Sequence, residues 1–269
     1  MILISILRPQ KLSLVTSTPT SYYAPVAYHV TGLISALIFL LSIGGLWAQL
    51  RFIWHRKAAF HAGDSTHRPA AILSVNQFFS SFLAFFSFFL YGACLQLFNH
   101  YLVWPRLVAT ILTLGVLYEI MYDRRDWRSV SAFAICLALL LITPALLLVH
   151  PQAAHSGKLF SQGLIVLVTI LLAQGYTHQV AVIRRTGDTG AVSLRMHQFF
   201  LLKDLSTIVF ALAMGIAAGW PLLLLSSVSA ITKMITIWHF HWVRSSPLAH
   251  ERRNIGRAAN QAENLPALG

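Results

Sequence analysis

Two ionisable residues stand side by side inside a long apolar stretch. Lys203 and Asp204 interrupt HQFFLLKDLSTIVFALAMG, residues 197–215. Charged side chains inside a membrane segment are costly and usually face a partner or a polar cavity, so they are candidates for ligand binding or proton transfer. Neighbouring residues point about 100° apart on a helix, so we expect Lys203 and Asp204 to be too far round to pair with each other.

Polar residues continue from Asp204 along one helical face, with His197 seven positions before it and Thr207 three after it. The next apolar segment has a polar stripe of its own at helical spacing, formed by Ser226, Ser229, Lys233 and Thr236. Asp204 and Lys233 each lie about 8 residues from the same membrane face, roughly 12 Å deep, so an Asp204–Lys233 ion pair is geometrically allowed. Two roles stay open: substrate or proton-coupling groups, or a buried structural pair with Lys203 reaching toward the headgroups.

Residues 71–95 have a neutral polar stripe at the same kind of spacing, formed by Asn76, Ser80, Ala84, Ser87 and Tyr91. A neutral hydrogen-bonding wall opposite a charged one would suit a small polar solute. The candidate substrate-binding or coupling residues are therefore Asp204, Lys233, His197, Asn76, Ser80 and Ser229.

The composition indicates an all-α integral membrane protein. Hydrophobic residues make up 57% of the chain and charged residues 10%, against about 45–50% and about 25% in soluble domains. A membrane helix needs about 20 apolar residues. Segments of that length are predicted at 30–50, 71–95, 102–122, 129–149, 159–182, 196–217 and 220–242, with a tight turn near Ala218, Gly219, Trp220 and Pro221.

The net charge of +12 is explained by topology. Most Lys and Arg residues fall in alternate loops, while the opposite side has only Arg8, Lys11, Arg106 and Lys158. By the positive-inside rule the basic loops face the cytoplasm, so the N-terminus is expected outside and the C-terminus inside. This predicts a plasma membrane protein of the bacterial inner-membrane type and leaves no need for nucleic acid as a partner.

Three short patterns recur in the same order in the two halves of the chain. They are a Gly-x3-Gln-x3-Ile pattern (Gly45 with Gln49, Gly175 with Gln179), a Gln-Phe-Phe run (Gln77, Gln198) and a Trp-Pro pair (Trp104, Trp220). Their shared order predicts two three-helix repeats that a linker helix makes parallel, a 3+1+3 architecture with a site between the halves. The expected units are a leader (1–29), the first repeat (30–122), the linker (123–149), the second repeat (159–242) and a basic, disordered cytoplasmic tail (243–269).

The Gly-x3-Gln helix ends, the basic Gly/Thr-containing loop at 184–190 and the 3+1+3 layout resemble the PQ-loop repeat family, which includes SWEET sugar transporters and cystinosin-type amino-acid transporters. The resemblance implies alternating access and a small solute, a sugar or an amino acid, with protons as a candidate coupling ion. The family's Pro before Gln is replaced by Ala48 and His178. Glycines could supply flexibility instead. The hinge or structural residues are Gly45, Gln49, Gly175, Gln179, Gln77 and Gln198, with the glutamines expected to bond neighbouring helices.

A seven-helix receptor or sorting protein that binds without transport is the alternative. No nucleophile with a base, phosphate-cradling loop or pair of catalytic carboxylates is evident in the sequence, so we expect neither an enzyme nor a cofactor. The histidines lack carboxylate or Cys neighbours at ligand spacing, so no metal site is expected. Cys94 and Cys136 lie inside apolar segments and predict no disulfide framework. The oligomeric state is left open, with a homo-oligomer as one option.

Overall fold

The computed structural model describes residues 23–61, 73–150, 153–189 and 194–263. Within these ranges the chain is entirely α-helical, as predicted, and seven of its helices are long and apolar enough to cross a membrane. The helices are α1 (Tyr23–His61), α2 (Val75–Ala93), α3 (His100–Arg124), α4 (Trp127–Val149), α5 (Ala154–Thr186), α6 (Leu194–Ala213), α7 (Ile216–Ser245) and α8 (Pro247–Glu263).

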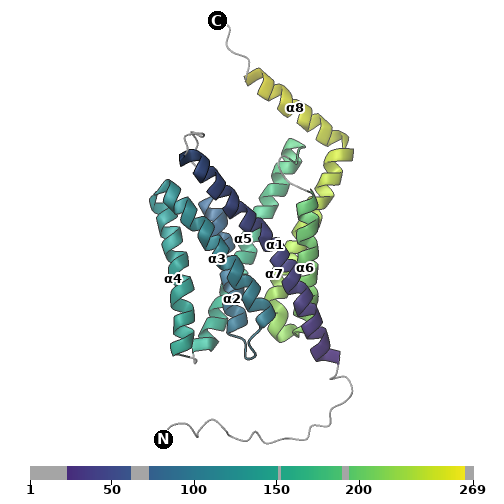
Figure 1. Cartoon of the computed structure of the whole chain (residues 1–269). Helices are drawn as coiled ribbons and strands as arrows, with labels where there is room; N and C mark the ends of the chain where they lie inside the picture. The colour runs from purple at the N-terminus through teal and green to yellow at the C-terminus, as the bar shows by residue number, and fades with distance from the viewer. Residues whose placement is uncertain (1–22, 62–72, 151–152, 190–193, 264–269) are drawn as a thin grey trace, which may run out of the picture.

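Helices α1 to α7 run up and down through the body of the molecule, and α8 projects from its upper end (Figure 1). α3 packs against α1 and α2, and α7 packs against α5 and α6. Two further contacts join these groups, α1 with α6 and α2 with α5, while α4 packs on α2 and α3. Through these contacts the seven long helices form one continuous bundle.

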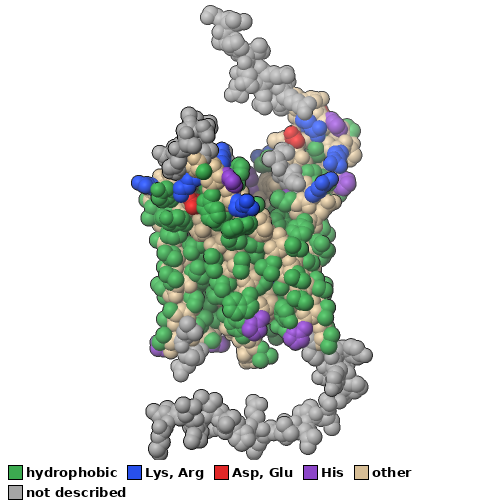
Figure 2. Space-filling view, in the orientation of Figure 1, with side chains coloured by type: hydrophobic (Ala, Val, Ile, Leu, Met, Phe, Trp, Pro, Cys, Tyr) green, Lys and Arg blue, Asp and Glu red, His purple; other side chains and the backbone are tan. Residues whose placement is uncertain are grey.

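The surface divides into an apolar band and a basic end. Hydrophobic side chains cover the middle of the body, and Lys and Arg side chains gather at the end from which α8 projects (Figure 2). The apolar band includes long exposed side chains such as Leu41, Leu141 and Ile170. Exposed leucine and isoleucine at this density fit a lipid environment better than water.

Two predicted boundaries are wrong. α1 begins at Tyr23, so residues 23–29 of the expected leader are helical, and Tyr28 packs its ring against Tyr101 and Phe210. The turn before α7 lies at Met214 and Gly215 rather than at 218–221. Gly215 has φ 81°, a conformation that glycine adopts without steric cost and that ends α6 abruptly.

Gly219, expected in that turn, instead lies inside α7 and lets it approach α6 closely. A Cβ built at Gly219 would stand 2.0 Å from the Ala211 carbonyl oxygen. Pro221 is also helical, in the second turn of α7, where it removes one backbone hydrogen bond near the start of the helix.

The expected disordered tail is helical over residues 247–263. Arg253 donates hydrogen bonds to the carbonyl oxygens of Gly187 (3.0 Å) and Val243 (3.0 Å), and Arg252 donates to that of Arg184. These carbonyls belong to the C-terminal ends of α5 and α7, which have unpaired acceptors and a partial negative charge. Composition suggested disorder because it does not reveal that the basic side chains meet these two helix ends.

The interior differs between the two ends of the chain. An apolar cluster built from α1 to α4 includes Phe82, Phe86 and Leu117, all buried, with the two Phe rings stacked 5.7 Å apart. α6 and α7 also bury apolar residues such as Phe210 and Leu222, but their buried surfaces include a large polar set: Asp204, Thr207, Ser226, Ser229, Lys233 and Thr236.

Candidate functional site

Asp204 is buried between two lysines. Lys203 Nζ lies 2.8 Å from Asp204 Oδ1, and Lys233 Nζ lies 2.7 Å from Asp204 Oδ2. Asp204 is 1% exposed and Lys233 4%. The predicted Asp204–Lys233 pair is thus present, joining α6 to α7 near the middle of both helices.

The expectation that Lys203 could not reach its neighbour is wrong, and so is the option that it reaches toward the headgroups. The Cα–Cβ bonds of adjacent residues diverge by about 100°, but four methylene groups let the lysine ammonium curl back across that angle. Lys203, Asp204 and Lys233 thus form a triad. The Lys203 side chain remains 20% exposed, whereas that of Lys233 is buried.

Hydroxyl groups of Ser229 and Thr207 contact the two lysines that pair with Asp204. Lys233 donates a second hydrogen bond to Ser229, one turn earlier on α7. Thr207, one turn after Lys203, bonds to the Lys203 carbonyl at 2.9 Å and lies 3.5 Å from the Ser35 hydroxyl of α1. The polar stripes predicted for α6 and α7 therefore face each other, and Ser35 of α1 lies beside Thr207.

Aromatic rings enclose the inner lysine. Lys233 Nζ lies 5.4 Å from the ring centroid of Tyr176 on α5 and 5.9 Å from that of Phe200. His197, buried at 3% exposure, lies edge-on to Tyr176 with centroids 6.4 Å apart. An ammonium held over aromatic faces is stabilised electrostatically even where water is excluded.

Arg106 adds a third cation close to Lys203. It was expected among the charges outside the membrane, but it is buried in α3 at 4% exposure. Its Cζ lies 4.0 Å from the Phe39 ring centroid on α1, and Lys203 Nζ lies 5.9 Å from the same centroid. We call Arg106, Lys203, Asp204 and Lys233 the charged cluster.

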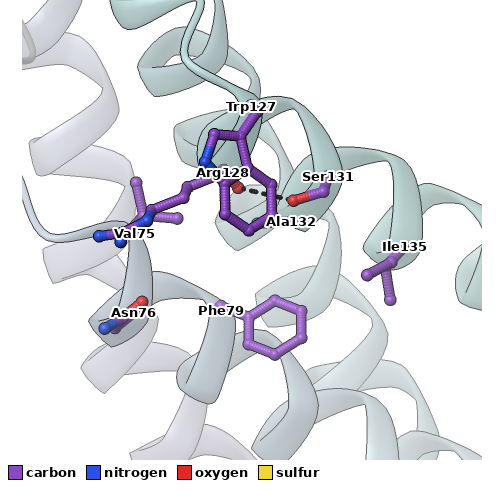
Figure 3. A pocket seen from close by; sticks show the side chains of 8 residues that line it. All are labelled: Val75, Asn76, Phe79, Trp127, Arg128, Ser131, Ala132 and Ile135. Carbon is purple, nitrogen blue, oxygen red and sulfur yellow. Dashed lines mark hydrogen bonds between the residues drawn. The ribbon is translucent and has the colours of Figure 1, made fainter.

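Asn76 and Ser80 are not brought to this cluster. Asn76 is exposed in a groove of about 310 Å³ between α2 and α4, with Phe79, Trp127 and Arg128 (Figure 3). The helix contacts explain this, since the main partners of α2 are α3, α4 and α5. Only the other end of the predicted α2 stripe turns inward, where the Tyr91 hydroxyl donates to the Ala218 carbonyl at 2.8 Å.

Four of the six predicted hinge and structural residues are exposed, and the other two, Gln49 and Gln179, are half-buried. Gly45 and Gly175 are exposed inside the unbroken helices α1 and α5, with nothing within 4 Å of a Cβ built on either. The four predicted glutamine side chains make no hydrogen bond to a neighbouring helix within the described ranges: Gln49, Gln77, Gln179 and Gln198. The hydrogen bonds expected of them between helices are therefore not seen there.

Three residues that sequence reasoning did not assign to the site belong to it: Arg106, Phe39 and Tyr176. Arg106 had a usable signal, because it falls inside the apolar segment predicted at 102–122 and intramembrane charge is a functional indicator. Phe39 and Tyr176 had none, since an aromatic residue in an apolar helix is ordinary.

In the part of the chain that the structure describes, no group of three or more His, Cys, Asp or Glu side chains could hold a metal ion. Comparison with known proteins adds no assignment: no family model matches the chain and no curated protein matches it.

Proposed function

We propose that the protein is a transporter or facilitator that moves a small polar solute, a sugar or an amino acid, across a plasma membrane of the bacterial inner-membrane type. Two parallel triplets, α1–α3 and α5–α7, rock about the site between them, and α4 links them. The C-terminus and α8 lie on the cytoplasmic side, which the basic end of the surface supports. The resemblance to the PQ-loop repeat family supports the same reading.

The helix contacts support the two-triplet arrangement. α3 contacts α1 and α2 as α7 contacts α5 and α6, and the crossing contact of α1 with α6 has its counterpart in that of α5 with α2. Each contact between the triplets is thus repeated when the first triplet is exchanged for the second. Such pairing is what two similar units related by an axis through the bundle produce.

The observation that carries the proposal is that the second triplet has charges where the first has apolar residues. Aligning the Gln-Phe-Phe runs places Phe82 and Leu83 opposite Lys203 and Asp204. Aligning the Trp-Pro pairs places Leu117 opposite Lys233. Phe82, Leu117 and Leu83 pack in the apolar cluster of the first triplet.

The same packing positions can therefore be filled without ions. A buried ion pair often adds no stability over well-packed hydrophobic residues of similar size. Charges that packing does not require are better explained by solute binding or proton transfer. This favours substrate or coupling roles for Asp204, Lys233 and His197.

Uptake into proteoliposomes tests the proposal. A panel of sugars and amino acids would be offered with and without a pH gradient to the wild type, to Asp204→Asn and to the triple variant Lys203→Phe, Asp204→Leu, Lys233→Leu, which copies the first triplet. We expect flux in the wild type and none in the triple variant, which should still fold.

Normal flux through a folded triple variant would make the charges structural. Saturable binding of a solute without flux would replace transport by the receptor or sorting role.

A further inference from the structure

The charged cluster has more positive than negative charge. Three cations, Arg106, Lys203 and Lys233, surround the carboxylate of Asp204. Asp204 has already committed one oxygen to each lysine. Within the described residues, no ion pair joins Arg106 to Asp204, and a buried charge without an ionic partner is costly.

Arg106 also has unused hydrogen-bond donors. Its Nε is buried without a partner. Its guanidinium carbon lies over the face of Phe39, 4.0 Å from the ring centroid. Guanidinium has five N–H donors in a rigid fork that matches a carboxylate or a phosphate, and leaving such donors unpaired away from water is unfavourable.

The unused donors of Arg106 and the excess positive charge lie close together. Arg106 and Lys203 both sit over the Phe39 ring, at 4.0 and 5.9 Å from its centroid, so the two cations are within about 10 Å of each other. A small oxyanion near Phe39 would meet the guanidinium fork directly and the lysine charges electrostatically.

Depth favours a solute over a lipid headgroup. Arg106 is six residues from the start of α3, about 9 Å along the helix from the end of the bundle away from α8. Asp204 is ten residues from the start of α6, about 15 Å from the opposite end. Headgroups lie at the membrane surface, outside a hydrocarbon core of about 30 Å. A soluble ligand entering between the triplets has no such limit.

We infer that the charged cluster binds the carboxylate or phosphate group of a small organic anion, with Arg106 as the principal donor. Lys203 and Lys233 supply further positive charge, and Asp204 positions both ammonium groups and limits the excess charge. The inference rests on the proposed function and names its substrate class. It narrows the candidate solutes to acidic ones and disfavours a neutral sugar.

Thermal unfolding of the purified chain in detergent tests binding without requiring flux. The probes are lactate, succinate, inorganic phosphate and glycerol 3-phosphate, each at constant ionic strength set with chloride. Lactamide, succinamide and glycerol are the neutral twins of the three organic anions. We expect at least one anion to raise the unfolding midpoint saturably while its neutral twin does not.

Variants then locate the effect. Arg106→Gln should weaken that anion's apparent affinity at least tenfold, and Arg106→Lys should weaken it less because the charge remains while the fork is lost. Arg128→Gln, which changes an exposed arginine in the groove of Figure 3, should leave it unchanged. Without any anion, Arg106→Gln should unfold no earlier than the wild type, since it removes an uncompensated buried charge.

The inference is overturned if no anion shifts the midpoint, or if the shift survives in Arg106→Gln. A lipid source is tested by repeating the measurement in phosphatidylcholine nanodiscs with and without phosphatidylglycerol. Stabilisation by phosphatidylglycerol that the anions do not compete with would also overturn it. Anion binding without flux would contradict transport alone, whereas sugar flux that is indifferent to anions would contradict only this inference.

Discussion

Asp204 pairs with Lys203 through one carboxylate oxygen and with Lys233 through the other, so one negative charge has two positive partners. Lys233 is the more deeply buried of the two side chains, 5% exposed against 20%. The cost of losing a partner in such a pair depends on burial, because an exposed ammonium recovers its hydration and a buried one does not.

Asp204→Asn should lower the free energy of unfolding by about 3–5 kcal/mol, because it strands a buried ammonium. Lys233→Met should cost more than Lys203→Met, because it leaves buried Asp204 with only the partly exposed Lys203, whereas Lys203→Met keeps the buried Asp204–Lys233 pair. Glu251→Gln, at an exposed position on α8, is the matched control and should be neutral. Chemical unfolding in detergent micelles measures all four. Equal costs for the two lysine variants would argue that the triad is evenly solvated.

Sequence reasoning identified much of this site and missed the rest for physical reasons. Asp204 and Lys233 were paired because helical spacing and depth can be read from a sequence. The Lys203–Asp204 contact was missed because Cβ direction says little about the end of a flexible lysine. Asn76 was grouped with the site because its spacing matched a stripe, but spacing does not say which neighbour a helix face meets, and α2 meets α4 there.

At the scale of helices, Gly219 of α7 and Gly175 of α5 have opposite surroundings, one crowded and one open. Gly219 lies where α7 touches α6, and a Cβ there would overlap the Ala211 carbonyl oxygen. Gly175 is exposed in α5 with open space around it. Helix bounds near such residues were predictable only to within several residues, because the turn depends on the backbone angle of Gly215 rather than on composition.

Gly219→Ala should destabilise the protein by about 3 kcal/mol, because the overlap forces α6 and α7 apart. Gly175→Ala should stabilise it by about 0.5–1 kcal/mol through the lower conformational entropy of the unfolded chain. Unfolding midpoints compare the two. If Gly175 is a hinge, its variant will be more stable and yet slower in proteoliposome uptake, and an unchanged uptake rate would remove the hinge role.

The docking of α8 depends on two arginines that reach the ends of other helices. Arg253→Ala should remove the bonds to the Gly187 and Val243 carbonyls and free α8 from α5 and α7. Hydrogen exchange over residues 247–255 should then accelerate at least tenfold, for a lost interaction of about 1.5–3 kcal/mol. Asn254→Ala, at an exposed neighbour, is the control. Unchanged exchange in Arg253→Ala would mean that Arg252 and the packing of buried Ala249 are enough to hold the helix.

At the scale of the whole molecule, an apolar band with one basic end is what composition and charge distribution predicted, and it is the part of the fold that survives errors at single residues. Hydrophobic length and loop charge are sums over many residues, so a misplaced boundary changes them little. How the two triplets pack against each other is harder to predict, because it depends on which helix faces meet and not on sums over many residues.

The orientation of the chain can be tested with single cysteines. Cys94 and Cys136 are buried at 7% and 0% exposure, so they give little background with a membrane-impermeant maleimide. Leu97→Cys lies between α2 and α3 at 86% exposure, and Asn254→Cys lies on α8 at the basic end. Intact cells should label Leu97→Cys alone, and inverted vesicles Asn254→Cys alone, because basic segments are retained on the cytoplasmic side. The reverse pattern would place α8 outside. It would also reverse which end of the charged cluster faces the cytoplasm, so that Arg106 would be met first by a solute leaving the cytoplasm rather than by one entering from outside.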